Sequence, residues 1–374
     1  MSQHTTAQLI SVIGVGRLGI CMALCLEKAG YQVLGVDVSQ DYIDQINQKT
    51  LDSPEPLVNE YLKKSQNFRA TTDLKEALDF SDIYFLVAPT NTIPEVESYD
   101  HRIMSQILSD INSYKVKNKH IVISSTVFPG YISKTAKNLV QDCENITLNY
   151  NPEFIAQGDI IQGLLYPDIV LIGEGSEQAG NAIASIYQKM CKNSPSIEKM
   201  STDSAEITKL AINCFITAKI AFANLVGDIA DETAGADKIA ILNAVGKDRR
   251  IGLASLKPGY GFGGPCFPRD NIALGNYATL LGIEPVLFRA TDKANQLHAD
   301  YQAQKLLEQN LDEYVFEGVC YKSDSPVPII ENSPKLVIAQ KLAEQGKDVV
   351  ILDIESVITK VKNHYSDLFS YKQK

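Results

Sequence analysis

The chain has 374 residues, of which 45% are hydrophobic and 21% are charged, and its formal net charge is −10. This composition is typical of a globular protein of two or three domains and excludes a disordered chain. The acidity argues against nucleic acid as a partner, because a phosphate backbone selects a basic protein face.

The first predicted element lies in an apolar run, Leu9–Leu26, which is long enough to span a membrane. A charge at Arg17 and three glycines interrupt this run, and no basic stretch precedes it. We therefore expect a buried strand that turns into a helix, and neither a signal peptide nor a membrane segment.

Short apolar runs and amphipathic stretches alternate over residues 9–200. The alternation predicts a mostly parallel sheet with helices on both faces, a doubly wound, Rossmann-like α/β fold. The expected strands are Leu9–Ile13, Gln32–Asp37, Asp82–Val87, His120–Ser124, Thr147–Tyr150 and Ile169–Ile172. The expected helices include Leu18–Ala29, Asp100–Ile111, Ser133–Gln141 and Glu177–Lys189.

A long helix is predicted over residues 202–233, because this segment has no proline, a single glycine and apolar residues at helical spacing. Such a helix spans ~45 Å and can bridge two domains or form a dimer seam. Further helices are expected at Lys238–Val245, Ile272–Leu281 and Phe288–Leu307.

The last region is predicted as a small α/β unit, with strands at Tyr314–Tyr321 and Asp348–Asp353 and a helix at Ser333–Glu344. The lysine-rich C-terminal end is expected to be ordinary solvated surface. These elements predict three domains: a Rossmann-like domain over residues 1–200, an all-helical domain over 201–305, and a shortened α/β domain over 306–374.

A GxGxxG pattern, residues 14–19, lies between the first strand and the first helix. In such a turn Gly14 permits the tight bend, Gly16 lets backbone amides approach a pyrophosphate, and Gly19 allows close packing. Asp37 closes the second strand at the spacing expected for an acid that binds the adenosine ribose. With no arginine directly after it, Asp37 favours NAD over NADP. The alternative is a glycine-rich turn without a ligand.

Cys266 follows four glycines in the run from Gly259 to Asp270, and Pro268 suits the first turn of the next helix. The thiolate of a cysteine just before a helix N-terminus is stabilised by the local field, which is what a nucleophile needs. A lone cysteine is more often an apolar residue of the core, and we interpret the other six in that way: Cys21, Cys25, Cys143, Cys191, Cys214 and Cys320. Without a CxxC pair, the cysteines indicate a reducing cytoplasm and no metal site.

Other polar residues admit two interpretations. Lys209 and Asn213 share one face of the long helix and can stabilise an oxyanion, or can belong to a solvated helix face. Glu153, which follows a strand, can be a general acid or base or can cap a turn. Thr126 is a strand-end hydroxyl, and such groups are usually structural.

In combination, these motifs resemble the UDP-glucose/GDP-mannose dehydrogenase family. The matching stretches run from about residue 10 to residue 300: the glycine turn with Asp37, Ser125–Val127 before Pro129-Gly130, Asn151–Phe154, the helix with Lys209 and Asn213, Asp248–Gly252, and the loop through Cys266 and Asp270. The resemblance implies that a nucleotide-sugar C6 alcohol is oxidised to a carboxylate by two NAD, through a Cys266 thiohemiacetal and thioester. UDP-glucose is the first choice of substrate, with GDP-mannose or another nucleotide sugar as the alternative.

The resemblance also implies roles for individual residues. The catalytic set is Cys266, Lys209, Asn213, Asp270, Glu153 and Thr126, with Asp270 supporting Lys209 or the hydrolytic water. The cofactor-binding set is Gly14, Val15, Gly16, Arg17, Leu18, Gly19, Asp37, Pro89, Thr90 and Thr126. The substrate-binding set is Glu153, Phe154, Ile155, Lys209, Asn213, Arg250, Lys257, Tyr260, Gly261, Gly263 and Lys322. Arg250 is similar to an arginine that reaches a partner's substrate, so a homodimer or higher homo-oligomer is expected.

Several positions depart from the family pattern. Tyr42 stands near a position that is often basic, Gln157 stands where an acid is common, and no arginine precedes Glu331. These departures concern the nucleotide and cofactor contacts. Two alternative hypotheses for the function stay open. One is a simpler dehydrogenase that yields one NADH per substrate. The other is a catalytically weakened regulatory protein that binds NAD or a nucleotide sugar.

Overall fold

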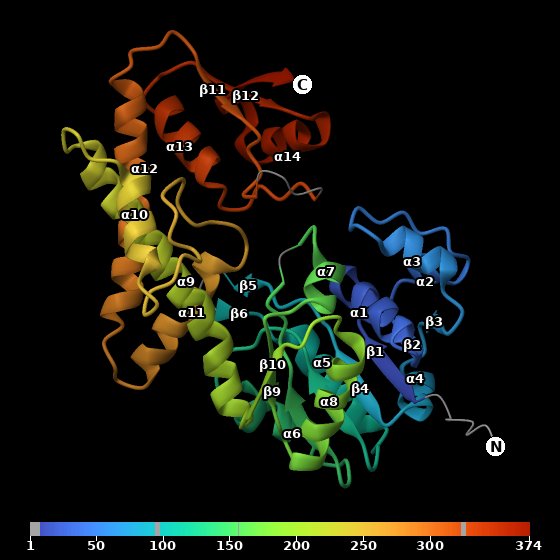
Figure 1. Ribbon diagram of the computed structural model, residues 1–374. Helices are drawn as coiled ribbons and strands as arrows, with labels where there is room; N and C mark the ends of the chain where they lie inside the picture. The colour runs from blue at the N-terminus through green and yellow to red at the C-terminus, as the bar shows by residue number, and fades with distance from the viewer. Residues whose placement is uncertain (1–7, 94–97, 156, 323–326) are drawn as a thin grey trace. The chain divides into compact units, whose positions relative to one another are not determined.

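The computed structural model describes residues 8–93, 98–155, 157–322 and 327–374 (Figure 1). The chain divides into two compact units, Met1–Lys209 and Leu210–Lys374. The three domains expected from the sequence stay a prediction, and the first seven residues of the first of them lie outside the described residues.

The first unit is built on an eight-stranded sheet with the order β10-β9-β8-β7-β4-β1-β2-β3. Its strands are β1 (Leu9–Ile13), β2 (Gln32–Val36), β3 (Phe68–Thr71), β4 (Ile83–Leu86), β7 (His120–Ile123), β8 (Thr147–Tyr150), β9 (Ile169–Gly173) and β10 (Ser196–Met200). Neighbouring strands are parallel except β8 and β9, which pair antiparallel. A separate two-stranded ladder joins β5 (Thr92–Ile93) and β6 (Ser98–Tyr99).

Side chains alternate between the two faces of this sheet, as the period of a strand requires. In β1, Val12 packs with the helices of one face, whereas Ile13 packs with those of the other. The first face is covered by α1 (Arg17–Lys28), α2 (Gln40–Asn47), α3 (Val58–Lys64), α7 (Ile160–Leu165) and α8 (Glu177–Met190). The second is covered by α4 (Leu74–Phe80), α5 (Arg102–Ser113), the π-helix Ile132–Ala136 that leads into α6 (Lys137–Leu139), and the start of α9 (Thr202–Asp231). The doubly wound fold is therefore confirmed.

The topology reverses between β1 and β4, because the chain runs from β1 to β2 and β3 on one side and from β4 to β7 and β8 on the other. At such a switch point the loops after neighbouring strands diverge and leave room for a ligand beyond the carboxyl ends of the strands. The apolar run Leu9–Leu26 forms β1 and α1 at this point, as expected.

The second unit begins within α9 and continues through α10 (Lys238–Lys247), α11 (Phe267–Leu280) and α12 (Val286–Leu307). A parallel three-stranded sheet follows, in the order β11-β12-β13. It is formed by β11 (Tyr314–Glu317), β12 (Val349–Asp353) and β13 (Ser370–Gln373), with α13 (Pro334–Ala343), α14 (Glu355–Tyr365) and a short 3-10 turn, Ser366–Leu368. The lysines of the C-terminal end are exposed, as expected: Lys360, Lys362, Lys372 and Lys374. The same segment also buries Val357 and Val361 of α14 in this small core.

Candidate active site

The glycine turn between β1 and α1 has the geometry that a dinucleotide requires. Gly14 has φ +97°, and a Cβ there would overlap the carbonyl oxygen of Val87, so only glycine fits. A Cβ at Gly19 would overlap the carbonyl oxygen of Gly14, which shows how closely the helix packs on the turn. Gly16, by contrast, faces open space with no atom within 4 Å of a Cβ.

The N-terminus of α1 is left available for an anion. Gly16 is the cap residue, no side chain caps the helix, and its first turn carries no acidic residue. The free backbone N–H groups and the helix dipole therefore favour a phosphate at this point. Arg17, the first residue of the helix, is exposed and donates to the side-chain oxygen of Gln157.

Three more predicted cofactor residues follow strands of the same sheet edge. Asp37 directly follows β2, and its backbone N–H donates to Thr71. Pro89 is exposed and Thr90 is buried in the loop after β4. Ser125 connects this loop to the loop after β7, because its hydroxyl donates to the Ala88 carbonyl (2.5 Å) and accepts from the Ala88 N–H (2.9 Å). The residues on this edge thus fit a bound NAD, which would supply the hydride acceptor.

Glu153 lies in the segment after β8 and is half-buried. The Tyr187 hydroxyl lies 2.5 Å from its Oε1 atom. Burial raises the pKa of the Glu153 carboxyl to about 7, although the Tyr187 hydroxyl and the Lys209 ammonium act to lower it. A carboxyl with a pKa near neutrality suits an acid or base in catalysis.

Lys209 is buried beside the same segment. Its Nζ donates to the backbone carbonyl of Glu153 at 2.7 Å and lies 4.4 Å from the centre of the Phe154 ring. The alternative of a solvated helix face is therefore wrong for Lys209. Ile155 is half-buried and contacts the helix α7 at Gly163.

Thr126 is half-buried in the loop after β7. A carboxylate that was not expected from the sequence holds this loop. Glu206, fully buried in the first turns of α9, accepts from the N–H of Gly130 at 2.6 Å and from that of Ile132 at 2.9 Å. Burial raises the pKa of Glu206 to about 7, against these two hydrogen bonds. Its burial could have been predicted from the sequence, because Glu206 is an acidic side chain within the apolar stripe of a predicted helix.

In the second unit, Cys266 is the cap residue of α11, and Pro268 lies in the first turn of that helix. The Cys266 side chain is exposed, whereas the other cysteines are buried or half-buried. Burial raises the pKa of those thiols, to about 12 in Cys25 and Cys214 and to about 11 in Cys191. They are poor nucleophiles for this reason, as their interpretation as core residues requires.

Asp270 connects the start of α11 to α9. Its buried carboxylate accepts from the amide nitrogen of Asn213 at 2.6 Å, and its Oδ1 lies 3.6 Å from the Arg269 guanidinium. One turn along α9, the Thr217 hydroxyl donates to the side chain of Asn271. Asn213 is thus a buried, hydrogen-bonded residue and not part of a solvated helix face.

The glycine loop before Cys266 is pinned by polar side chains of two helices. Asn295 on α12 forms two 2.9 Å hydrogen bonds with the backbone of Phe262, and Asn224 on α9 accepts from the N–H of Gly259. His298 contacts the Gly259 carbonyl with Nε2 and the carboxylate of Asp228 with Nδ1. These contacts give the loop a defined backbone although it contains four glycines.

Close packing explains two of these glycines. A Cβ at Gly261 would overlap the side chain of Asn295, and one at Gly263 would overlap the carbonyl oxygen of Asn332. The loop therefore packs on its own protein at these positions. The exposed side chains of the predicted substrate set in this unit are Arg250, Lys257, Tyr260 and Lys322.

Comparisons with known proteins identify the family. Residues 8–191 match the NAD binding domain of the UDP-glucose/GDP-mannose dehydrogenase family, and residues 203–297 match its central domain. The chain belongs to the UDP-glucose/GDP-mannose dehydrogenase family.

Similar members of this family act on different nucleotide sugars. The GDP-mannose 6-dehydrogenase of Pseudomonas aeruginosa is 28% identical over 358 residues, which cover 92% of this chain and 80% of that protein. The UDP-glucose 6-dehydrogenase of Haloferax volcanii is also 28% identical, over 364 residues covering 92% and 83%. The solved UDP-glucose dehydrogenase of Pyrobaculum islandicum superposes with a TM-score of 0.88 at 25% identity, covering all of this chain and 88% of the other.

Membership confirms the resemblance drawn from the motifs, the α/β fold and the NAD cofactor. The protein is an NAD-dependent oxidoreductase of the nucleotide-sugar dehydrogenase kind. The roles of the individual site residues stay predictions.

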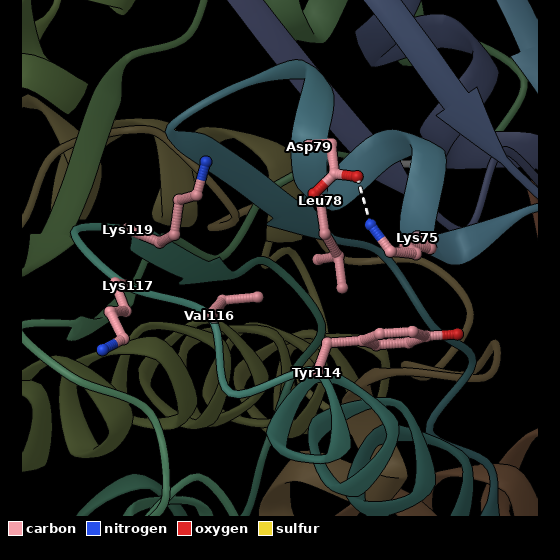
Figure 2. Close-up of a pocket in the computed structure, with 7 residues that line it drawn as sticks. All are labelled: Lys75, Leu78, Asp79, Tyr114, Val116, Lys117 and Lys119. Carbon is pink, nitrogen blue, oxygen red and sulfur yellow. Dashed lines mark hydrogen bonds and ion pairs between the residues drawn. The ribbon is translucent and has the colours of Figure 1, made fainter.

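A surface pocket, shown in Figure 2, is separate from the residues of the glycine turn. It is lined by α4 and the segment after α5, at the amino ends of β4 and β7, whereas the glycine turn follows the carboxyl end of β1. Its cations are neutralised: Lys75 pairs with Asp79, Lys119 with Asp82 at 2.8 Å, and Lys117 with Glu144 at 2.7 Å. We assign the pocket no part in catalysis.

Proposed function

We propose that this protein oxidises the C6 alcohol of a nucleotide sugar to a carboxylate with two NAD, and that UDP-glucose is its substrate. The observation that carries the proposal is Cys266, the exposed thiol at the N-terminus of α11, directly after the pinned glycine loop. A four-electron oxidation must retain the aldehyde between two hydride transfers, and a covalent thiol adduct does this.

The reaction follows from the chemistry of that thiol. The alcohol loses a hydride to NAD and its hydroxyl proton to a base, which gives the aldehyde. The Cys266 thiolate adds to the aldehyde carbon and forms a thiohemiacetal, which loses a second hydride and a proton to become a thioester. Water then attacks the thioester carbon, the carbon–sulfur bond breaks, and the carboxylate leaves with the thiol restored.

The other site residues handle charge and protons. The Lys209 ammonium and the Asn213 amide stabilise the oxyanion that forms at the reacting carbon. Asp270 orients Asn213 through their 2.6 Å hydrogen bond. Glu153, with its pKa of about 7, exchanges the proton of the reacting alcohol or water, and Thr126 positions the water.

We further propose that the pinned loop with Lys257, Tyr260, Gly261 and Gly263 holds the nucleotide diphosphate, together with Lys322. Arg250, whose side chain is 81% exposed, is available to reach the substrate of a second subunit. On this basis the protein works as a homodimer or higher homo-oligomer. Its dispersed cysteines, without a CxxC pair, support a location in the cytoplasm.

A panel of UDP- and GDP-sugars tests the substrate and the stoichiometry together. UDP-glucose should yield two NADH per molecule and UDP-glucuronate, and Cys266→Ser should reduce carboxylate formation by on the order of 10³-fold or more. Cys143→Ser, at a half-buried thiol, is the matched control and should retain activity. One NADH per sugar would support the simpler dehydrogenase, and no NADH from any sugar would support the regulatory protein.

A further inference from the structure

Tyr187 has no role in the proposed reaction, yet its side chain contacts one of the proposed catalytic residues. It lies on α8, is buried, and places its hydroxyl between two side-chain oxygens of the segment after β8. The Oη atom is 2.7 Å from Oδ1 of Asn151 and 2.5 Å from Oε1 of Glu153.

The orientation of Asn151 determines what the hydroxyl can do. The Nδ2 atom of Asn151 donates to the backbone carbonyl of Leu171 at 3.0 Å, so Oδ1 must be the atom that faces Tyr187. Both neighbours of the hydroxyl are then oxygens, and a phenol has a single proton to donate. When Glu153 is ionised, Asn151 and Glu153 compete for that proton.

Protonation of Glu153 removes the competition. A neutral carboxyl donates its own proton to the Tyr187 oxygen, and the Tyr187 hydroxyl is then available to Asn151. All three polar groups have a partner in this arrangement. In the ionised arrangement the hydroxyl donates to the carboxylate, which is the stronger, charge-assisted hydrogen bond, and Asn151 loses its donor.

We propose that Tyr187 is a positioning residue for Glu153, whose single hydroxyl proton alternates between Asn151 and Glu153 so that the carboxyl keeps a partner in both protonation states. A group that accepts and returns a proton in each turnover needs such a partner, because an orphaned buried polar atom is costly. The inference rests on the proposed role of Glu153.

Three further titratable groups of the described residues act on Glu153. The Lys209 ammonium from α9 contacts its backbone carbonyl and favours the ionised carboxyl, and the thiols of Cys25 on α1 and Cys191 after α8 lie near the carboxyl. Burial raises the pKa of Glu153 to about 7, so both protonation states occur near neutral pH.

Two substitutions should move the titration of Glu153 in opposite directions. Tyr187→Phe removes the donor of the ionised state, so the pKa of Glu153 should rise by about one pH unit or more. Asn151→Ala removes the competing acceptor, so the Tyr187 proton stays with the carboxylate and the pKa of Glu153 should fall. A loss of packing alone would not produce opposite signs.

Infrared difference spectroscopy of the intact protein measures this titration without turnover. The carboxylic-acid band that Glu153→Gln abolishes identifies Glu153. Tyr84→Phe is the matched control, because its buried hydroxyl donates only to the Leu78 carbonyl and should leave the band midpoint unchanged. An unshifted midpoint in both folded variants, or shifts of the same sign, would overturn the proposal.

The kinetic readout separates this inference from the proposed function. If UDP-glucose is oxidised, the acidic limb of kcat should move with the infrared midpoint in Tyr187→Phe, while KM changes little. If no sugar is oxidised, the proposed function fails while the infrared titration still decides the role of Tyr187. If Tyr187→Phe does not fold, the downward shift in Asn151→Ala carries the test alone, and its absence contradicts the proposal.

Discussion

Gly14 and Gly16 flank Val15, and their missing side chains serve different purposes. Gly14 is required by the fold, because its φ of +97° and its approach to Val87 leave no place for a Cβ. Gly16 has a backbone conformation that other residues adopt, with φ −60°, and open space beside it. Its absent side chain matters only to a ligand that approaches the turn.

Alanine at each of the two positions should therefore give different defects. Gly16→Ala should leave the free energy of unfolding nearly unchanged but weaken NAD binding about tenfold or more, because the new methyl group occupies space that the pyrophosphate needs. Gly14→Ala should destabilise the fold by about 2 kcal/mol or more, through left-handed strain and overlap with Val87. Urea unfolding measures the stability and calorimetric titration measures NAD binding. A Gly14→Ala protein as stable as the wild type would contradict the structural role of Gly14.

At the scale of elements, the first turns of α9 hold the loop that carries Thr126. Glu206 accepts two backbone N–H groups of this loop, and the nearby Ser133 hydroxyl donates to Asp203 at 2.6 Å. The loop thus depends on a buried carboxylate whose pKa is raised to about 7. The consequence is a pH dependence of stability.

The sign follows from proton binding. Glu206 binds its proton more tightly in the folded protein than in the unfolded chain, where its pKa is near 4.5, so its ionisation costs stability as pH rises from about 4.5 to about 7. The Glu206→Gln protein does not lose stability in this way, because a glutamine side chain does not ionise. The stability of the wild type relative to Glu206→Gln should fall by at most about 1.4 kcal/mol per pH unit over that range.

Urea unfolding at several pH values measures this difference. Glu60→Gln is the control, because an ion pair with Lys64 lowers the pKa of the exposed Glu60 and its ionisation is stabilising. The stability of the wild type relative to Glu60→Gln should therefore change in the opposite sense and at lower pH. A constant difference between the wild type and Glu206→Gln would show that Glu206 has the same pKa in the folded and unfolded states, and would contradict this prediction.

At the scale of the whole molecule, α9 exposes an apolar stripe in the second unit. Phe215, Phe222, Leu225 and Ile229 are each at least half exposed, and their spacings of seven, three and four residues put them on one face of the helix. By length and composition α9 could also cross a membrane. A stripe on one face, with other residues of the helix packed in the core, fits a helix that meets a second copy of the chain better.

Phe222→Asp should weaken self-association on the order of a thousandfold, because it places an unpaired charge in the proposed seam. Analytical ultracentrifugation measures the change, and Leu311→Asp, at another exposed apolar residue, is the control. An unchanged mass distribution in Phe222→Asp would exclude this stripe as the seam.

Mixed dimers test whether Arg250 completes the partner's site. Arg250→Ala and Cys266→Ser should each be inactive, and mixing them should restore about a quarter of the wild-type activity, because half of randomly formed dimers are mixed and each has one complete site. No recovery on mixing would place both residues in the same site of one subunit.

Much of the fold could be predicted from the sequence because its signals are local. The expected strands of the first unit occur within one residue of their predicted ends, since most of them are the largely apolar runs that a sheet covered on both faces requires. The strand β10 was missed because it is a largely exposed edge strand, with the sequence Ser196–Met200 and little apolar pattern. The glycine turn and Cys266 could be singled out for the same local reason, since each combines several informative residues within one turn, and the role of Cys266 stays a prediction.

The sequence by itself determined the fold class and the cofactor, because backbone sterics and periodic burial leave their record in neighbouring residues, and the family was indicated by the resemblance of its combined motifs. Only the tertiary structure brought Tyr187 to Glu153, Glu206 to the loop after β7, and Asn295 to the glycine loop. Each of these contacts joins residues 33 to 76 positions apart. A hydrogen bond depends on where two side chains meet in space, and no local pattern records that meeting.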